Sequence, residues 1–312
     1  MTTTDMQTLK LAIIGAPTSV ASFAPGQEKA PAALRAAGLE GRLRSAGIDT
    51  EDLGDLPVSR WTADREWYSG PTMARIVADV IAARDCVASA HAAGYLPLLI
   101  GGNCTLALAM VAGTLTPNRS IGLIYFDGHL DLNTPTTEPD GAVDWMGVTH
   151  LLGVDGCIES LRDIGPRSPL LTPECVVFLG VNADSVTAFE KRQRQELHLQ
   201  VIEAAEVMVD ARAAALRALE WLPPDIESLL VHFDVDVIDF FDLPLAENYV
   251  RFGGLRLADA QEVLRTLLSD RRFDGLTITE LNPDHGAEDG STLSSFIDLL
   301  VDASSESPRL VR

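Results

Sequence analysis

Ile121-Gly-Leu-Ile-Tyr-Phe-Asp127-Gly-His129-Leu-Asp131 is an apolar run that ends in two carboxylates and an imidazole at alternate positions. A second segment has the same form, Ser228-Leu-Leu-Val-His-Phe-Asp234-Val-Asp236. Because side chains alternate between the two faces of a strand, this spacing predicts that each polar set points in one direction. Hard oxygen ligands and one nitrogen at the ends of two apolar strands indicate a shared metal site.

Strand-like and helix-like segments alternate along the chain. Strands are predicted over 11–15, 96–100, 121–126, 174–180, 228–233 and 275–281. Helices are predicted over 29–43, 73–93, from 105 onward, 184–197, 204–219, 257–268 and 292–302. This order predicts an α/β fold with a mostly parallel central sheet between two layers of helices. No linker, repeat or low-complexity segment divides the sequence, so residues 1–312 are predicted to form a single domain.

Composition argues against several classes of protein. A net charge of −21 argues against nucleic-acid binding, which needs a basic surface. That charge would suit a cationic substrate, but a solvated acidic surface is the simpler interpretation. No apolar run reaches transmembrane length, and residues 1–10 lack the layout of a signal peptide. Four cysteines without paired spacing predict a reducing, cytoplasmic environment.

Ligands of such sheets bind beyond the carboxyl ends of the strands, where the unusual polar residues of this chain are expected. Cys104 follows one predicted strand and Glu280 ends another, so four strand ends should converge on one pocket. A single Asp there commonly caps a turn, but this many carboxylates would repel one another unless cations neutralised them. Carboxylates with one imidazole suit Mn²⁺ or Mg²⁺, and two such ions can activate a shared water for hydrolysis.

These motifs resemble those of the ureohydrolase family, which includes arginase, agmatinase and formiminoglutamase. That family shows Gly-Gly-Asp-His, Asp-Ala-His-x-Asp, Ser-Phe-Asp-x-Asp and Glu-x-Asn-Pro. This chain has Gly101-Gly-Asn-Cys104, Asp127-Gly-His-Leu-Asp131, His232-Phe-Asp-Val-Asp236 and Glu280-Leu-Asn-Pro283. The similarity runs from about residue 10 to about residue 300. It implies a three-layer αβα fold of the arginase type, and hydrolysis of a guanidino or related C–N bond by a metal-bridging hydroxide.

The resemblance also implies a set of metal ligands. One ion would be held by Cys104, Asp127, Asp131 and Asp234, and a second by Asp127, His129, Asp234 and Asp236. The implied cofactor is Mn²⁺, two ions per chain, with Ni²⁺ or Zn²⁺ as alternatives. Cys104 replaces the family's His, and a thiolate is a softer ligand, so this site is expected to bind its ion weakly or to be empty. Alternatively, Cys104 is a small buried hydrophobic residue.

Catalytic and substrate-binding roles follow from the same resemblance. Asp131 would hydrogen-bond the hydroxide, and Glu280 would both bind and orient the guanidinium group of the substrate. Asp144 falls where arginases have a proton-transferring His. Asp140 falls where they have a Ser that helps to hold the substrate's carboxylate, while Asn133, a substrate-binding residue, is retained. A carboxylate at 140 would favour an amine or a neutral group.

Two further expectations concern substrate and assembly. The Asn-Cys motif resembles that of the ureohydrolase branch acting on modified arginines such as Nω-hydroxyarginine, and the family forms trimers and hexamers, so a homo-oligomer is expected. The competing hypothesis is a non-catalytic or regulatory binding protein of this fold with one catalytic metal or none. The change to His232 is interpreted as a packing change, and His150 as a structural residue.

Overall fold

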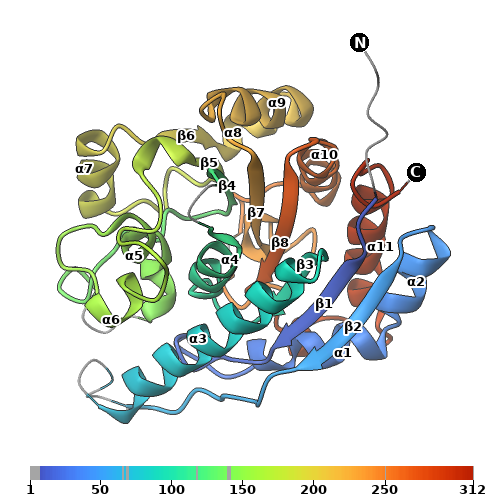
Figure 1. Ribbon diagram of the computed structural model, residues 1–312, viewed down its shortest axis with the longest axis horizontal. Helices are drawn as coiled ribbons and strands as arrows, with labels where there is room; N and C mark the ends of the chain where they lie inside the picture. Colours follow the sequence, from blue (N-terminus) through green and yellow to red (C-terminus); the bar gives the residue numbers. More distant parts are fainter. Residues whose placement is uncertain are drawn as a thin grey trace.

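The computed structural model describes residues 8–64, 67, 70–116, 119–138, 142–249 and 251–311. A central sheet lies between two layers of helices (Figure 1). Its eight strands are in the order β2-β1-β3-β8-β7-β4-β5-β6, and every neighbouring pair is parallel. The predicted three-layer αβα fold is therefore confirmed.

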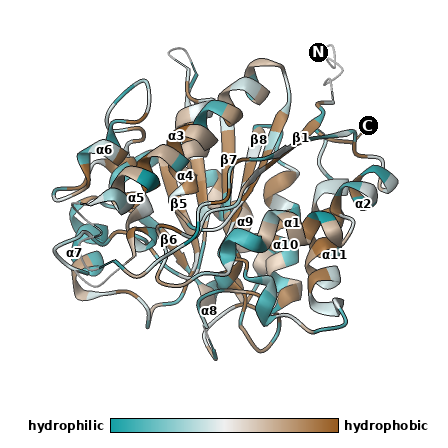
Figure 2. Ribbon diagram, turned by 90° about the horizontal axis from the view of Figure 1, so that it is seen from below, coloured by the Kyte–Doolittle hydropathy of each residue, from teal (hydrophilic) through white to brown (hydrophobic). Residues whose placement is uncertain are grey.

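The strands at the centre of the sheet are buried along their whole length. Parallel strands covered on both faces read as continuous apolar runs, and this made them visible in the sequence. Figure 2 shows the hydrophobic residues concentrated in these strands and the polar residues on the outer helices. The strands are β1 (Leu11–Ala16), β2 (Thr50–Asp55), β3 (Leu96–Gly101), β4 (Ile121–Phe126), β5 (Val176–Val181), β6 (Gln200–Glu203), β7 (Ser228–Asp234) and β8 (Phe273–Thr279).

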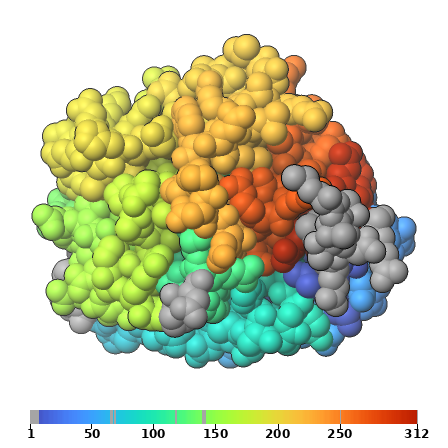
Figure 3. Space-filling model, turned by 45° about the horizontal axis from the view of Figure 1, so that its top comes forward, coloured from blue at the N-terminus to red at the C-terminus, as the bar shows by residue number. Residues whose placement is uncertain are grey.

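The helices form two layers with separate apolar cores. One core joins α3 and α4 to the sheet, and the other joins α9, α10 and α11 to its opposite face. In the space-filling view the surface over α9, in yellow, continues into that over α10, in orange (Figure 3). The helices are α1 (Ala30–Ala36), α2 (Leu39–Ser45), α3 (Pro71–Ala92), α4 (Leu106–Thr114), α5 (Gly147–Leu152), α6 (Glu159–Arg162), α7 (Ala188–Glu196), α8 (Ala204–Val207), α9 (Ala211–Trp221), α10 (Leu257–Leu268) and α11 (Ser291–Ser305). None of the described helices is long and apolar enough to cross a membrane.

Several predicted elements differ from the structure. The helix predicted over 29–43 is two helices, α1 and α2, because Gly38 adopts a left-handed conformation with φ of 86°. The helix predicted over 204–219 is also two, since Asp210 caps α9 by accepting a hydrogen bond from the Ala213 amide at 2.9 Å. The edge strands β2 and β6 were missed, because short, partly exposed edge strands lack a continuous apolar signal.

The polar clusters do not alternate along strands, so this prediction is wrong. β4 ends at Phe126, and β7 ends at Asp234, so most of the polar residues lie in the loops that follow. Asp131 adopts a positive φ of 49°, and residues 235–237 form one turn of 3-10 helix. The side chains nevertheless meet, because β4, β7 and β8 are adjacent and in register, and parallel neighbours end at the same edge of the sheet.

Candidate metal centre

One small pocket at the carboxyl edge of the sheet collects side chains from four adjacent strands. Strands β3, β8, β7 and β4 are consecutive in the sheet, so the segments that follow them meet at this edge. The cavity volume is about 10 Å³, which is room for about one water molecule. Among the described residues, no lysine or arginine lines it; the lining residues are Cys104, His129, Asp131, Asp144, Trp145, Asp234, Asp236, Asn248 and Glu280.

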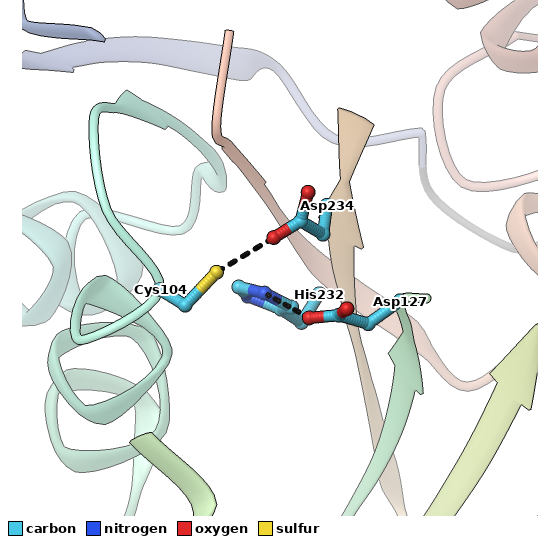
Figure 4. A group of neighbouring side chains, drawn as sticks. All are labelled: Cys104, Asp127, His232 and Asp234. Carbon is cyan, nitrogen blue, oxygen red and sulfur yellow. Dashed lines mark hydrogen bonds and ion pairs between the residues drawn. The ribbon is translucent and has the colours of Figure 1, made fainter. Parts of the chain in front are cut away.

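The first group of potential ligands joins sulfur, nitrogen and carboxylate oxygen. Cys104, Asp127, His232 and Asp234 each offer one ligand atom, and these atoms all lie within 4.8 Å of one another. Figure 4 shows them facing a common point. The Cys104 thiol donates a hydrogen bond to Asp234 Oδ2 at 2.8 Å, and His232 Nε2 lies 3.9 Å from Asp127 Oδ2. All four residues are buried.

The second group shares Asp127 with the first. His129 Nδ1 lies 3.0 Å from Asp236 Oδ2 and 3.4 Å from Asp127 Oδ1. On its other side, the Asn248 amide nitrogen lies 3.2 Å from His129 Nε2 and donates to Asp236 Oδ2 at 3.3 Å. Asp127 is therefore placed between two sets of ligands, as a residue that bridges two ions would be.

The third group shares Cys104 with the first. Cys104, Asp144 and Glu280 also offer atoms within 4.8 Å of one another. The Cys104 amide donates to Asp144 Oδ1, and the Gln27 side-chain amide donates to Glu280 Oε2 at 2.5 Å. Glu280 has a positive φ of 62°, which turns its side chain into the pocket from the end of β8. Both carboxylates thus stand beside the candidate ligands.

Three predicted site residues have other surroundings. Asp131 lines the pocket but accepts a hydrogen bond from the Tyr125 hydroxyl at 2.5 Å and belongs to none of the three groups. Asn133 is buried outside the pocket lining, and its Oδ1 accepts from the Thr187 hydroxyl at 3.2 Å. Asp140 lies outside the described residues.

Burial strongly perturbs the ionisation of these groups. It raises the pKa of Asp127 to about 7, with the Asp236 charge acting in the same direction, and it raises that of Asp144 to about 6. Burial also raises the pKa values of Asp131, Asp234 and Glu280 well above their ordinary range. These shifts mean that protons must take the place of positive charge wherever no cation is bound.

A cation also fits the hydrogen bonding of the pocket. Buried polar atoms are almost always paired, because an unpaired one costs about 1–3 kcal/mol. Here two carboxylate oxygens of the proposed ligands are buried without a hydrogen-bond partner in the described part of the chain, Asp127 Oδ2 and Asp236 Oδ1. Divalent cations would satisfy these oxygens, so the residues present fit a metal centre.

Sequence reasoning missed four residues around this centre. His232 packs its ring against Tyr125, as a packing residue would, but its Nε2 also faces the first group of ligands. Asn248, Tyr125 and Gln27 contact His129, Asp131 and Glu280 respectively. His232 and Tyr125 carried a sequence signal, because each lies two positions before an aspartate of a ligand motif, Asp234 and Asp127 respectively. Gln27 and Asn248 are brought in by long-range contacts.

The sequence from residue 9 to residue 304 matches the model of the Arginase family. The chain belongs to the Arginase family. It is 29% identical to the arginase of Bacillus caldovelox over 281 residues, covering 88% of this chain and 91% of that protein. In fold it resembles the crystal structure of arginase from Bacillus subtilis, with a TM-score of 0.83 and 24% identity over 95% of this chain and 98% of that one.

A second protein of similar fold is named as a different enzyme. The formimidoylglutamase of Bacillus subtilis has a TM-score of 0.72 at 17% identity, over 97% of this chain and 90% of that one. The Arginase-family fold thus occurs in proteins named for different substrates. The ureohydrolase resemblance is confirmed, and this protein is an Arginase-family hydrolase with a candidate metal-binding cluster.

Proposed function

We propose that this protein hydrolyses a C–N bond of a guanidino or related compound, using two divalent ions. The observation that carries the proposal is a pair of ligand groups that share Asp127, beside a pocket that Asp144 and Glu280 line. Cys104, Asp127 and Asp234 would hold one ion, and Asp127, His129, Asp234 and Asp236 the other. When bound, such a pair of ions activates water as a nucleophile at neutral pH.

Glu280 is suited to hold the guanidinium group of the substrate. A carboxylate can accept two parallel hydrogen bonds from the planar guanidinium fork, which positions the carbon for attack. Gln27 fixes Oε2 of Glu280, and the Glu280 carboxyl also hydrogen-bonds with that of Asp144. A cationic substrate would also lower the cost of keeping Glu280 ionised, because burial raises the pKa of this carboxyl.

Asp131 and Asp144 are suited to hold protons. The Tyr125 hydroxyl fixes Asp131 Oδ2 at the pocket wall, where Asp131 would orient the attacking water. Burial raises the pKa of Asp144 to about 6, which lets this carboxyl exchange a proton near neutral pH as a proton-transferring His does. Asp144 is therefore proposed to pass a proton to the leaving amine.

The identities of the substrate, the metal ion and the assembly are further parts of the proposal. Asp140 and Asn133 would bind the far end of the substrate, and Asp140 would make free L-arginine a poor substrate. A modified arginine such as Nω-hydroxyarginine is the proposed substrate on the resemblance of the Asn103-Cys104 motif. We propose Mn²⁺ as the ion of the His129 group, and a cytoplasmic homo-oligomer as the assembly, with no nucleic-acid or membrane partner.

A screen of guanidino compounds tests the proposed function. The protein is loaded with Mn²⁺ or Zn²⁺, its metal content is measured, and release of urea or a substituted urea is followed with arginine, Nω-hydroxyarginine and agmatine. Turnover that disappears with chelation and returns with metal is expected. Glu280→Gln should keep its metal but lose turnover by about 100-fold or more, as expected when a group that positions the reacting carbon is removed.

A matched variant makes the loss interpretable. Glu247 is another buried carboxylate close to Glu280, but it faces Asn282 and does not line the pocket. Glu247→Gln should therefore keep most of the turnover. Metal-loaded protein with no turnover of any compound would favour the non-catalytic alternative and overturn the proposal.

A further inference from the structure

His232 lies at a place in the sheet where an imidazole has an unusual environment. It belongs to β7, is completely buried, and stacks on the Tyr125 ring at 4.2 Å between centroids with 8° between planes. Its Nε2 lies 3.3 Å from the Thr279 hydroxyl and 3.9 Å from Asp127 Oδ2. Stacking thus fixes the plane of the ring, and Nε2 is directed toward the Cys104 group.

Two departures from the family motifs meet at this point. Cys104 replaces a His in the loop after β3, and His232 replaces a Ser on β7. The two residues belong to one group of potential ligands, and Figure 4 shows the His232 ring between Cys104 and Asp127. One change removes an imidazole from the first metal site, and the other introduces one from a neighbouring strand.

We propose that His232 is a ligand of the first ion, which is held by Cys104, Asp127, His232 and Asp234. This inference rests on the metal centre of the proposed function and goes beyond its ligand set. The site then has one sulfur, one nitrogen and two carboxylate ligands. Such a set favours Zn²⁺ or Co²⁺ over Mn²⁺, because thiolate is a soft ligand.

Distances and burial support this ligand set. Ligand bonds to Zn²⁺ are about 2.0–2.3 Å, so two ligands of one ion lie at most about 4.6 Å apart. The 2.8 Å between Cys104 Sγ and Asp234 Oδ2 and the 3.9 Å between His232 Nε2 and Asp127 Oδ2 are both within this limit. Asp127 Oδ2 is also a buried oxygen with no hydrogen-bond partner among the described residues. An ion between these atoms would pair it.

A second buried histidine provides the comparison. His150 on α5 is as completely buried as His232, and its Nδ1 pairs with the Met146 carbonyl at 2.5 Å. It belongs to none of the groups of potential ligands in the described residues. Loss of the His150 ring therefore measures the cost of removing a buried imidazole without touching the metal centre.

Metal binding by His232→Ser tests the proposal directly. Zn²⁺ and Co²⁺ affinities of both sites are measured by competition with a chelator, for the wild type, for His232→Ser and for His150→Asn. We expect His232→Ser to lower the affinity for one of the two ions by about tenfold or more, as changes around metal ligands do. His150→Asn should leave both affinities unchanged. The sulfur-to-Co²⁺ charge-transfer absorption should also shift in His232→Ser alone. Unchanged affinities and an unchanged spectrum would overturn the proposal.

A measurement on the unaltered protein covers the case in which the variants do not fold. X-ray absorption of the doubly Zn²⁺-loaded wild type should show two imidazole ligands, from His129 and His232, and one sulfur over the two ions. One imidazole over two ions would contradict the assignment of His232. The double variant Cys104→His with His232→Ser should shift the preference of the first site from Zn²⁺ toward Mn²⁺, because an imidazole then replaces sulfur.

The proposed function and this inference fail in different ways. If no ion binds, or if the loaded protein turns over no guanidino compound, the proposed function fails. If two ions bind and hydrolysis proceeds, but absorption shows a single imidazole, only the role of His232 fails. Both outcomes can be read from the same preparation of protein.

Discussion

The Cys104 thiol donates a hydrogen bond to Asp234 Oδ2 at 2.8 Å and so links the loop after β3 to the end of β7. Burial, followed by the charge of Asp234, raises the pKa of this thiol well above 9.0. An ion that binds here must therefore displace a proton from sulfur before it can use the thiolate. Metal binding in the first site should therefore depend on pH, through the proton of the Cys104 thiol.

Substitution of Cys104 should change metal content more than stability. Cys104→His is expected to raise Mn²⁺ occupancy, because imidazole suits Mn²⁺ better than thiolate does. Cys104→Ala should lower metal content while leaving the thermal unfolding of the metal-free protein nearly unchanged. Elemental analysis alongside thermal unfolding checks both variants. A loss of about 1 kcal/mol or more with unchanged metal content would instead identify Cys104 as a core residue.

The two ions should leave in a defined order. His129 and Asp236 are fixed by Asn248, whereas the first site contains a protonated thiol, so the second site should hold its ion more tightly. Mild dialysis is expected to remove about one ion per chain, and a strong chelator the other. If Asp236→Asn keeps the ion that resists mild dialysis and loses only the weakly held one, the Cys104 site is the tighter of the two and the prediction is contradicted.

Metal-free protein should lose stability as pH rises above about 6.5. Burial raises the pKa of Asp127 to about 7, so in the folded state this carboxyl keeps a proton that the unfolded chain has released. Its contribution to stability is present below 3.8 and is lost as pH rises through about 7. His129, whose pKa Asp236 raises well above 6.5 against the effect of burial, changes stability in the same direction. Thermal unfolding at about pH 6.5 and about pH 8 should differ by about 2 °C or more.

The choice of these two pH values removes an opposing effect. Burial lowers the pKa of His150 to about 4 and that of His232 to about 3, so they destabilise the fold only below about pH 6.5. Saturating Zn²⁺ should abolish the loss at about pH 8, because the ions replace the displaced protons. Equal unfolding temperatures of the metal-free protein at both pH values would show that the pocket carboxyls are ionised already at the lower one.

Asp144 should set the alkaline limb of the activity profile, because a carboxyl that donates a proton to the leaving amine must itself be protonated. Asp144→Asn should reduce kcat by about 100-fold and remove that limb, with metal content retained. The kcat profile against pH, measured with saturating metal, checks the prediction. A slower variant with an unchanged profile would mean that Asp144 only holds the Cys104 loop through its hydrogen bond to the amide.

Asp140 should control the choice between substrates with and without an α-carboxylate. A carboxylate facing another carboxylate costs several kcal/mol in a partly desolvated pocket, so Asp140→Ser should improve arginine relative to agmatine. The ratio of the two kcat/KM values is the proper measure, because a general loss of metal cancels in it. A ratio that stays constant would place the Asp140 side chain away from the substrate.

Local sequence patterns were sufficient for the central strands and for the identity of most site residues. β1, β3, β4, β5, β7 and β8 are buried apolar runs, which a sheet covered on both faces requires. Asp127 and His129 follow β4, Asp234 ends β7 and Asp236 follows it, in motifs that needed no tertiary information. The breaks at Gly38 and Asp210 were not anticipated, since helix periodicity continues across both.

By itself, then, the sequence determined the layers of the fold, its family and the set of carboxylates, because local sequence patterns show which strands are buried and which residue types follow them. Only the tertiary structure decided which atoms face one another. Strand order brings His232 of β7 beside Tyr125 of β4 and toward Cys104 after β3, although these residues are far apart in the chain. Such neighbours depend on the register of parallel strands and on loop conformations such as the positive φ of Asp131 and Glu280, which no local pattern specifies.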